Sequence, residues 1–451
     1  MPSVSYLSSA YQWTSDTISG IKNSIAQTKF AEDRFGINIE TPNTPFTIKK
    51  KYFHSSKPND SDNSTSSETI GYSNDSNLNQ FEIETVEKDL QILDLLKNNC
   101  PSLVSTKVSS NSAEPEITKS FFVPSPTLPL GDLQTMYISQ ISRKQTPMDI
   151  VKYDRELFKT QDGGTVSIDW APPLSEVPID NRPVVFILHG LSGGSHEYYV
   201  RAVTRMLTSE QYNFRVIVMN ARGCSRTPVT SPRLYNASYT NDFRLVVNNI
   251  KQRLPGSMLF GVGFSLGSNV LVKYVGEEGE NCPLTAAISV CNPFDLRKSS
   301  EYVQRPTLLN KYVYEPNLAR GIMRSMKRHY DVLSTGDFTE KLDKLNMKSG
   351  MRDIDDLVAT VFGYESRFHY YEEGSSKNFL DKVKVPLLCI NSMDDPVCPP
   401  ECIPKEEFFK NPHLVLALTN YGGHLGFFEG IYPEIWYKKP IAEFFKAIYD
   451  H

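Results

Sequence analysis

From residue 150 onward, short apolar runs alternate with segments that have the hydrophobic periodicity of helices. Several of these runs are apolar throughout, which is typical of strands buried on both faces. The alternation predicts an α/β fold with a mostly parallel sheet and helices on both faces. We expect strands at 165–170, 183–188, 215–219, 257–262, 286–290, 386–390 and 414–418, and helices at 196–209, 242–254 and 268–275.

Residues 297–380 interrupt this alternation. They are rich in Arg, Lys, Tyr and Met, and they contain helix-like pieces but no strong strand. Because they precede the last two expected strands, we predict a helical cap insertion over the carboxyl edge of the sheet. The predicted α/β core then comprises 121–296 and 381–451, and two further helices around 436–450 close it.

Residues 1–120 form a variable N-terminal extension in this division. The apolar spacing at 3–30 predicts an amphipathic helix, which either packs on the domain or docks on a lipid surface. Its polar face lacks the basic row that favours anionic lipid. The stretch 54–80 is dominated by Ser, Asn and Asp, as in a linker or disordered insert. A helix is expected over 81–99.

Composition narrows the range of functions. The formal net charge of −4 gives no general attraction to nucleic acid. No apolar run approaches the ~20 residues that span a bilayer, and the N-terminus lacks a secretory signal pattern. Scattered cysteines indicate a reducing compartment, and Cys398 and Cys402 lack the second ligand pair of a zinc site. We expect an intracellular protein, cytoplasmic or peripheral on lipid droplets or organelle membranes and not secreted, that needs no metal or cofactor; its oligomeric state is open.

The strongest chemical signal is the pattern Gly-x-Ser-x-Gly at Gly263, Ser265 and Gly267. It lies between the apolar run 257–262 and the apolar, helix-like segment 268–275. Strand, sharp turn and helix is the context in which this pattern forms a nucleophile elbow, with the serine hydroxyl exposed at a helix N-terminus. We therefore predict Ser265 as a nucleophile, against the alternative of an ordinary serine in a tight turn.

A serine nucleophile needs a base, and the base needs an acid that orients it. In folds built on a nucleophile elbow, the acid and then the histidine follow the serine along the chain. Asp394 and Asp395 follow the expected strand 386–390. We choose Asp395, because Pro396 fixes the turn after it. Asp394 would brace the loop, and Asp295 is the weaker competitor.

Four histidines are candidates for the base. His189 lies in a tight turn, His196 in a glycine-rich loop and His413 just before a strand. Only His424 comes after the acid and at the end of the final strand, so we predict it as the base. Loops that follow parallel strands lie at one edge of a sheet, so the three predicted residues can converge there.

An oxyanion hole needs two backbone N–H groups. Leu266, directly after the nucleophile, should provide one, and Leu191 in the glycine-rich loop after 183–188 is the best candidate for the other. That loop could instead be simply flexible, or a weak phosphate cradle, but it lacks the lysine of a P-loop. Arg222 is expected to brace this region rather than to contact substrate.

Together these motifs resemble the α/β-hydrolase superfamily, and within it the fungal medium-chain fatty acid ethyl ester synthase/esterases, whose relatives include monoacylglycerol lipases. The resemblance covers about residues 120–451 and implies Ser265, Asp395 and His424 as charge-relay residues. It also implies ester hydrolysis and, with an alcohol as acceptor, ester synthesis by acyl transfer. It is carried by His189-Gly190-Leu191, Asn220-Ala221-Arg222-Gly223, Gly263–Gly267, Asn292–Asp295, Asp394–Pro396, Gly423-His424 and an upstream Gly-x-Leu-Gln-Thr element at 131–135.

We expect a serine ester hydrolase that forms an acyl-enzyme from a small acyl ester or acyl-CoA. Water as acceptor gives esterase or lipase activity, and an alcohol such as ethanol gives an ethyl ester; a monoacylglycerol lipase is the nearest alternative. Some members of the family carry an Asp five positions after the histidine, linked with acyltransferase activity, where this chain has Glu429. The rival class is a non-catalytic scaffold that binds lipid or a protein partner.

Overall fold

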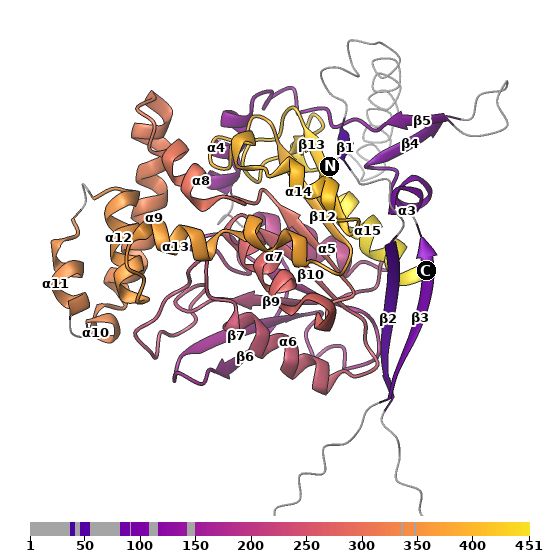
Figure 1. Ribbon diagram of the computed structural model, residues 1–451, viewed down its shortest axis with the longest axis horizontal. Helices are drawn as coiled ribbons and strands as arrows, with labels where there is room; N and C mark the ends of the chain where they lie inside the picture. Colours follow the sequence, from indigo (N-terminus) through magenta and orange to yellow (C-terminus); the bar gives the residue numbers. More distant parts are fainter. Residues whose placement is uncertain are drawn as a thin grey trace, which may run out of the picture.

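A nine-stranded sheet forms the centre of the molecule, in the order β1-β13-β12-β11-β10-β8-β9-β7-β6 (Figure 1). The computed structural model describes residues 37–40, 46–54, 82–90, 92–107, 116–141, 149–334, 337–346 and 349–451. The strands of this sheet are β1 (Asn38–Glu40), β6 (Asp154–Lys159), β7 (Thr165–Ala171), β8 (Val184–Leu188), β9 (Arg215–Asn220), β10 (Leu259–Phe264), β11 (Ala286–Val290), β12 (Leu387–Ser392) and β13 (Leu414–Thr419).

Strands β8 to β13 are parallel to one another, and β1, β7 and β6 join the sheet antiparallel at its two ends. Every residue of the six parallel strands is buried. Burial on both faces is the reason that these strands are almost continuously apolar in the sequence. The prediction of a mostly parallel sheet with helices on both faces is confirmed.

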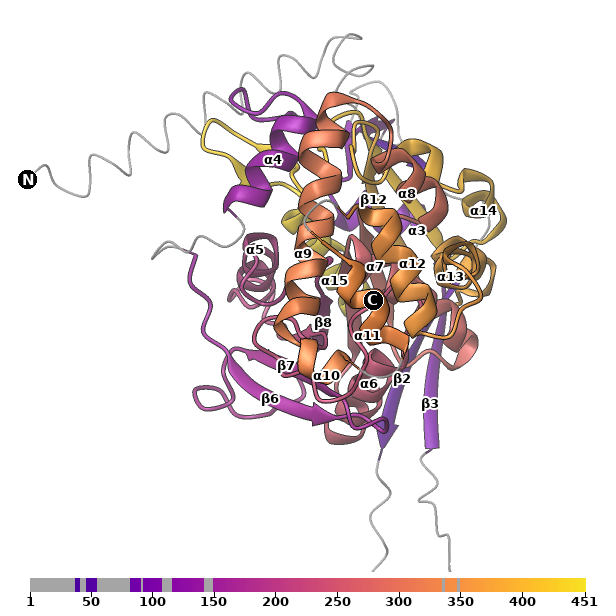
Figure 2. The same cartoon turned by 90° about the vertical axis from the view of Figure 1, so that its left-hand side faces the viewer.

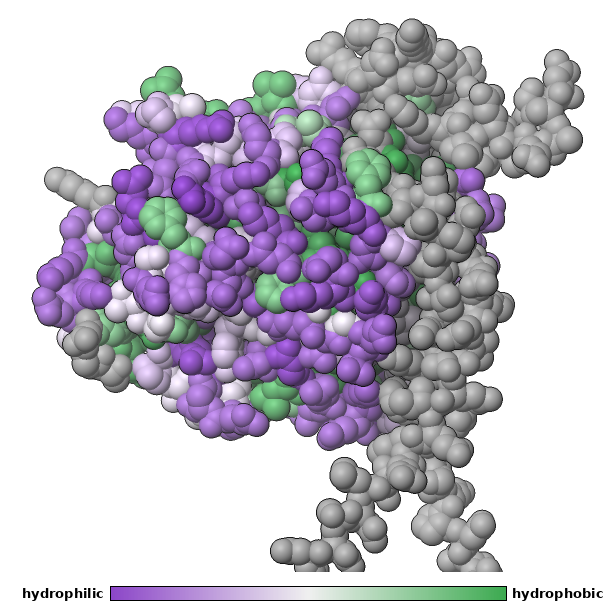
Figure 3. All heavy atoms as spheres, viewed as in Figure 1, coloured by the Kyte–Doolittle hydropathy of each residue, from purple (hydrophilic) through white to green (hydrophobic). Residues whose placement is uncertain are grey.

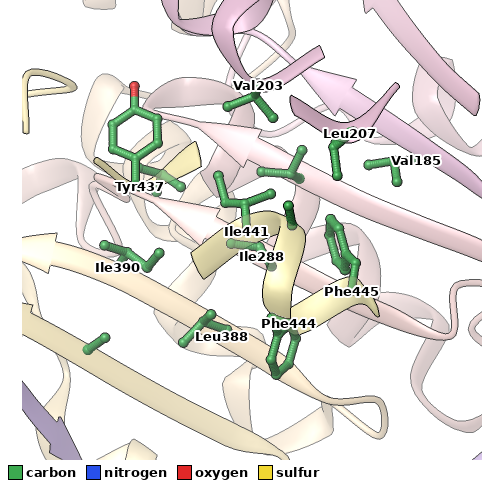
Figure 4. Packing of buried hydrophobic residues seen from close by; sticks show 14 of the residues in the cluster. Val185, Val203, Leu207, Ile288, Leu388, Ile390, Tyr437, Ile441, Phe444 and Phe445 are labelled. Carbon is green, nitrogen blue, oxygen red and sulfur yellow. The ribbon is translucent and has the colours of Figure 1, made fainter. Parts of the chain in front are cut away.

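Each face of the sheet packs against its own group of helices. On β8, Val185 and Ile187 belong to the core under α5 and α15, whereas Phe186 belongs to the core under α6 and α7. Successive strand side chains point to opposite faces, so one short strand supplies both cores. Figure 4 shows the first core, with Phe444 and Phe445 of α15 against the sheet. The covering helices are α5 (Tyr198–Leu207), α6 (Asn241–Arg253), α7 (Leu266–Glu278), α14 (Lys405–Lys410) and α15 (Lys438–Asp450).

The described part of 297–380 is helical and contains no strand, as expected from its sequence. Its helices bury a small core of their own, which includes Met323, Phe338 and Ile354. Figures 1 and 2 show α9 to α12 as a group beside the sheet. The helices are α8 (Leu296–Val303), α9 (Glu315–Arg328), α10 (Tyr330–Leu333), α11 (Asp337–Lys344), α12 (Met351–Val361) and α13 (Arg367–Gly374), with a π-helix η2 (Asn310–Tyr314) before α9.

The described N-terminal residues form small elements around this core. These elements are β2 (Phe46–His54), β3 (Glu82–Leu90), α3 (Ile92–Asn99), β4 (Val104–Lys107), β5 (Glu116–Lys119) and α4 (Gly131–Ile141), which precedes β6. The other short elements lie in connections of the core. They are η1 (Gly279–Asn281), η3 (Ser376–Lys382), η4 (Pro400–Cys402), β14 (Phe428–Glu429) and β15 (Glu434–Ile435).

Two expectations about local structure were wrong. The helix expected over 81–99 begins only at Ile92, because the residues before it form β3 and pair antiparallel with β2; a strand partner this distant in sequence leaves no local helix-or-strand signal. The two helices expected around 436–450 are one helix, since Pro440 lies in its first turn, where a missing N–H costs no hydrogen bond. The helix expected at 3–30 lies outside the described residues, as does the polar stretch 54–80 except its first residue.

The surface shown in Figure 3 is mostly hydrophilic, with apolar side chains scattered over it. Scattered apolar side chains are normal on a folded domain. Within the described ranges, no helix combines the length and the apolar character that crossing a bilayer requires.

Candidate active site

Five loops meet at the carboxyl edge of the sheet. They follow β13, β12, β11, β10 and β8, which are consecutive neighbours in the sheet. In that order, they carry His424, Asp395, Cys291, Ser265 and Leu191. Because parallel strands end at the same edge, residues that are far apart in the sequence become neighbours here.

The elbow around Ser265 is as tight as its glycines suggest. Ser265 has φ 52° and ψ −119°, a backbone conformation that residues with a side chain rarely adopt. A Cβ on Gly263 would lie 2.5 Å from the carbonyl oxygen of Gly267. A Cβ on Gly267 would lie 2.5 Å from the carbonyl oxygens of Leu188 and His189. Only glycine fits at both positions, and the Ser265 hydroxyl is left at the N-terminus of α7.

The three residues predicted for proton transfer lie in one hydrogen-bonded chain. The Oγ of Ser265 is 2.8 Å from Nε2 of His424, and Nδ1 of His424 is 2.9 Å from Oδ2 of Asp395. The other oxygen of Asp395 accepts from the N–H groups of Val397 (2.8 Å) and Cys398 (2.7 Å). The carboxylate is 1% exposed, so backbone donors hold it in place and satisfy it away from water.

The two competing acids have other partners. Asp394 Oδ1 accepts from the N–H of Gly423 at 2.8 Å, and burial raises the pKa of its carboxyl to about 6. Asp295 caps the N-terminus of α8 through Lys298 N–H (3.1 Å) and pairs with Lys377. Asp394 therefore braces the loop, as expected, and Asp295 lies in a structural ion pair.

The competing histidines are also engaged elsewhere. Nε2 of His189 accepts from Ala221 N–H at 3.1 Å, so Nδ1 carries the proton and donates to the Gly190 carbonyl. Burial lowers the pKa of His189 to about 4 and that of His413 to about 4, which keeps both rings neutral. His196 lies beside Glu197, with its Nε2 3.2 Å from that carboxylate.

The loop after β8 lies directly against the elbow. A Cβ on Gly190 would be 3.3 Å from the Cβ of Ser265. The hydroxyl of Tyr199 accepts from Gly190 N–H at 2.9 Å and holds the loop from α5. Leu191 and Leu266 line the same cavity as Ser265, which is where two oxyanion donors would have to lie.

A cavity of about 170 Å³ extends from Ser265 between the sheet edge and the cap. Its wall is mostly apolar, with one buried acid, Asp355 of α12. The hydroxyl of Tyr371 donates to Asp355 at 2.5 Å and that of Ser300 at 3.3 Å. Burial raises the pKa of Asp355 to about 6. The apolar side chains contributed by α8 to α12 include Leu296, Val303, Leu318, Ile322, Met326, Leu333, Phe338, Met351, Val358 and Val361.

Arg222 braces the region as predicted, although it borders the cavity. Its guanidinium binds the carboxylates of Asp162 and Asp242, each at 2.7 Å, and its side chain is 1% exposed. The hydroxyl of Ser231 accepts a further hydrogen bond at 2.8 Å. With its donors already bound in a planar fork, Arg222 has little capacity left for a substrate.

Cys291 was not singled out by sequence reasoning as part of this region. Its sulfur, an oxygen of Asp395 and a ring nitrogen of His424 lie within 4.8 Å of one another, a spacing that a metal could use. The sulfur accepts from Leu425 N–H at 3.2 Å, and burial raises the pKa of the thiol well above its usual range. A metal ligand must be a thiolate, so the donor set fits a metal poorly.

Thr135 and Gln134 of α4 are also in contact with the loop of His424, by hydrogen bonds to backbone N–H groups. Sequence reasoning noted their motif only as part of a family resemblance. No local pattern marks a residue whose partner lies at the other end of the chain, so only the motif itself drew attention to it.

The fold and this edge place the chain in a known class: it belongs to the alpha/beta hydrolase fold family, whose model matches residues 183–431. Among characterised relatives, it is 37% identical to embryogenesis-associated protein EMB8 of Picea glauca, over 62% of each chain. It is 35% identical to monoacylglycerol lipase of Saccharomyces cerevisiae, over 60% of each chain. The chain thus spans about three fifths of the length of these two relatives. It is 33% identical to medium-chain fatty acid ethyl ester synthase/esterase 2 of S. cerevisiae, over 71% of this chain and 84% of that one.

Proposed function

We propose that the protein is a serine ester hydrolase that acts on medium-chain acyl esters through an acyl-enzyme, with Ser265, His424 and Asp395 as its catalytic residues. The observation that carries the proposal is the continuous chain of 2.8 Å and 2.9 Å contacts from the Ser265 hydroxyl to a buried carboxylate. Its position at the mouth of an apolar cavity supports an acyl substrate.

In the proposed mechanism, Nε2 of His424 takes the proton of Ser265 as Oγ attacks the carbonyl carbon of the ester. The N–H groups of Leu191 and Leu266 donate to the oxyanion of the tetrahedral intermediate. Asp395 accepts from Nδ1–H, which keeps Nε2 free as a base and stabilises the imidazolium. The imidazolium then protonates the leaving alcohol or thiol, and the acyl group stays on Ser265.

The acceptor of the acyl group decides the product. Water, deprotonated by His424, attacks the acyl carbon; the bond to Oγ of Ser265 then breaks, the imidazolium returns its proton to Oγ, and the acid is released. Attack by an alcohol such as ethanol releases an ester, with acyl-CoA or another ester as the donor. The apolar wall supports transfer, because a drier site lets an alcohol compete with water. The similarity to an ester synthase and to a monoacylglycerol lipase supports both outcomes.

The Ser265→Ala variant tests the proposal. Its turnover of a medium-chain nitrophenyl ester should fall by about 10⁴-fold or more, as in other serine triads, and its labelling by a fluorophosphonate should vanish. Ser209→Ala, at the end of α5, is the matched control and should keep both. If the native protein reacts with neither reagent, it is a non-catalytic scaffold and the proposal is wrong.

The ratio of hydrolysis to acyl transfer can be measured by comparing the products formed from three donors in parallel. Acyl-CoA with ethanol, monoacylglycerol in water and ethyl ester in water would be supplied at equal acyl length. Ethyl ester formed from acyl-CoA, absent in Ser265→Ala, supports transfer. Release of acid alone from every donor restricts the protein to hydrolysis.

A further inference from the structure

The loop that carries His424 has a strained backbone. Its φ angle is positive at Gly422 (150°), Gly423 (59°), Leu425 (62°) and Phe427 (45°). Leucine and phenylalanine rarely adopt such angles, which persist only where the surrounding structure enforces them. The position of the His424 ring therefore depends on whatever holds this loop.

Helix α4 holds it, from 289 positions earlier in the chain. The hydroxyl of Thr135 accepts from His424 N–H at 2.8 Å and donates its own proton to the Gly131 carbonyl at 2.7 Å. The proton is used within the helix, so the hydroxyl oxygen faces the loop as an acceptor. The side-chain oxygen of Gln134 accepts from Phe428 N–H at 2.7 Å. Figure 2 shows α4 beside the C-terminal segment that contains this loop.

The contact between α4 and the loop is also close in its packing. A Cβ on Gly423 would lie 2.5 Å from the Thr135 hydroxyl, and a Cβ on Gly426 would lie 2.6 Å from the Cβ of Gln134. The buried face of α4 consists of Gly131, Gln134, Thr135 and Ile138, on the spacing of one helical stripe. Two glycines thus bring the loop down onto this stripe.

Two acidic residues join α4 to the rest of the site. Asp394, next to the proposed catalytic acid, binds both Gly131 N–H and Gly423 N–H, and so bridges the helix and the loop. On the other side, the hydroxyl of Tyr314 in η2 donates to Asp132. α4 therefore lies between the histidine loop and the cap, with hydrogen bonds to both.

We propose that α4 is a positioning element for the proposed catalytic histidine, with Thr135 and Gln134 as positioning residues; this inference rests on the proposed function. The stretch matched by the family model begins at residue 183, so a segment outside it would complete the site. Gln134 supports a role beyond packing. Its side chain is fully buried, and its amide nitrogen has no hydrogen-bond partner among the described residues. An unpaired buried N–H group costs free energy, so an apolar residue would fill the same space better.

The experiment compares Thr135→Val, which keeps the shape and removes the acceptor, with Thr135→Ser, which keeps the acceptor. For Thr135→Val we expect kcat on a medium-chain nitrophenyl ester to fall by about 10- to 100-fold, with KM within about twofold, because the base is displaced while the cavity is intact. Thr135→Ser should keep most of kcat. The rate of fluorophosphonate labelling should follow kcat in both variants.

Gln134→Met, which removes the acceptor for Phe428 N–H at similar size, provides a second and independent test if Thr135→Val does not fold. A selective loss of kcat in either variant, with most of kcat kept in Thr135→Ser, supports the proposal. Native kcat in both Thr135→Val and Gln134→Met, or in whichever of the two folds, overturns it, as does an equal loss in Thr135→Val and Thr135→Ser. Failure of the proposed function would look different, since the native protein itself would then show neither turnover nor labelling.

Discussion

The buried acid of the cap makes the stability of this protein depend on pH. Asp355 is 8% exposed, and burial raises the pKa of its carboxyl from 3.8 to about 6, against the hydrogen bonds from Tyr371 and Ser300 that favour ionisation. In the unfolded chain the carboxyl ionises near its ordinary pKa. Between these two values the folded state holds a proton that the unfolded state has lost, so stability falls as pH rises and levels off above about 6.

The size of the effect follows from the two pKa values. One unit of pKa difference corresponds to about 1.36 kcal/mol, so the full shift costs about 3 kcal/mol, of which about 2 kcal/mol falls between pH 4.5 and 7.5. Asp355→Asn cannot ionise at this site. Relative to the native protein, the variant should therefore gain about 2 kcal/mol in free energy of unfolding over that range.

Urea unfolding of the native protein and Asp355→Asn at matched pH values measures this difference. Asp394, whose pKa burial also raises to about 6, titrates in both proteins, so its contribution cancels in the comparison. A difference that stays constant from pH 4.5 to 7.5, or one that changes in the opposite direction, would refute the reasoning.

Two further predictions concern stability. Gly267→Ala forces a Cβ to within 2.5 Å of two backbone carbonyl oxygens and should lower the free energy of unfolding by about 3 kcal/mol or more. Gly321→Ala lies inside α9, where the nearest atom to the new Cβ is 3.5 Å away, and should raise it by about 0.5–1 kcal/mol. The urea midpoints of the two variants, measured in parallel, should shift in opposite directions. Arg222→Met removes the guanidinium that lies 2.7 Å from both Asp162 and Asp242, and leaves Asp162 only its longer 3.8 Å contact with Arg233. It should lower stability by about 2–3 kcal/mol, since Asp162 is partly screened by solvent; a thermal midpoint equal to that of the native protein would contradict this.

Much of the fold was predictable because its signals are local. The runs that became β8 and β10 are apolar throughout since both sheet faces are covered, and that composition is visible in a few residues. The elbow was visible for a similar reason. The glycine pattern is itself a short segment: Gly263 is crowded by Gly267 and Ser268 in the same turn, although the atoms that crowd Gly267 belong to Leu188 and His189 at the end of β8.

Distant pairings were not predictable. Residues 82–90 were expected to be helical, but they form a strand because they pair with β2. β2 lies far away in the sequence, so this pairing could not be read from the neighbours of 82–90. The contact of Thr135 with His424 and the bonds of Asp355 with Tyr371 and Ser300 likewise join separate segments. Hydroxyl and carboxyl groups of this kind are common on surfaces, so nothing in their neighbours along the chain marks them.

The amino-acid order alone was therefore sufficient to identify a parallel α/β architecture and to name Ser265, Asp395 and His424 as candidates, since strand periodicity and loop position after a strand are properties of short segments. Folding decided the rest: the contacts that hold the His424 loop, the acid in the cavity wall and the cavity itself. These depend on which segments touch, and that is settled by burial of the whole chain rather than by any stretch of it.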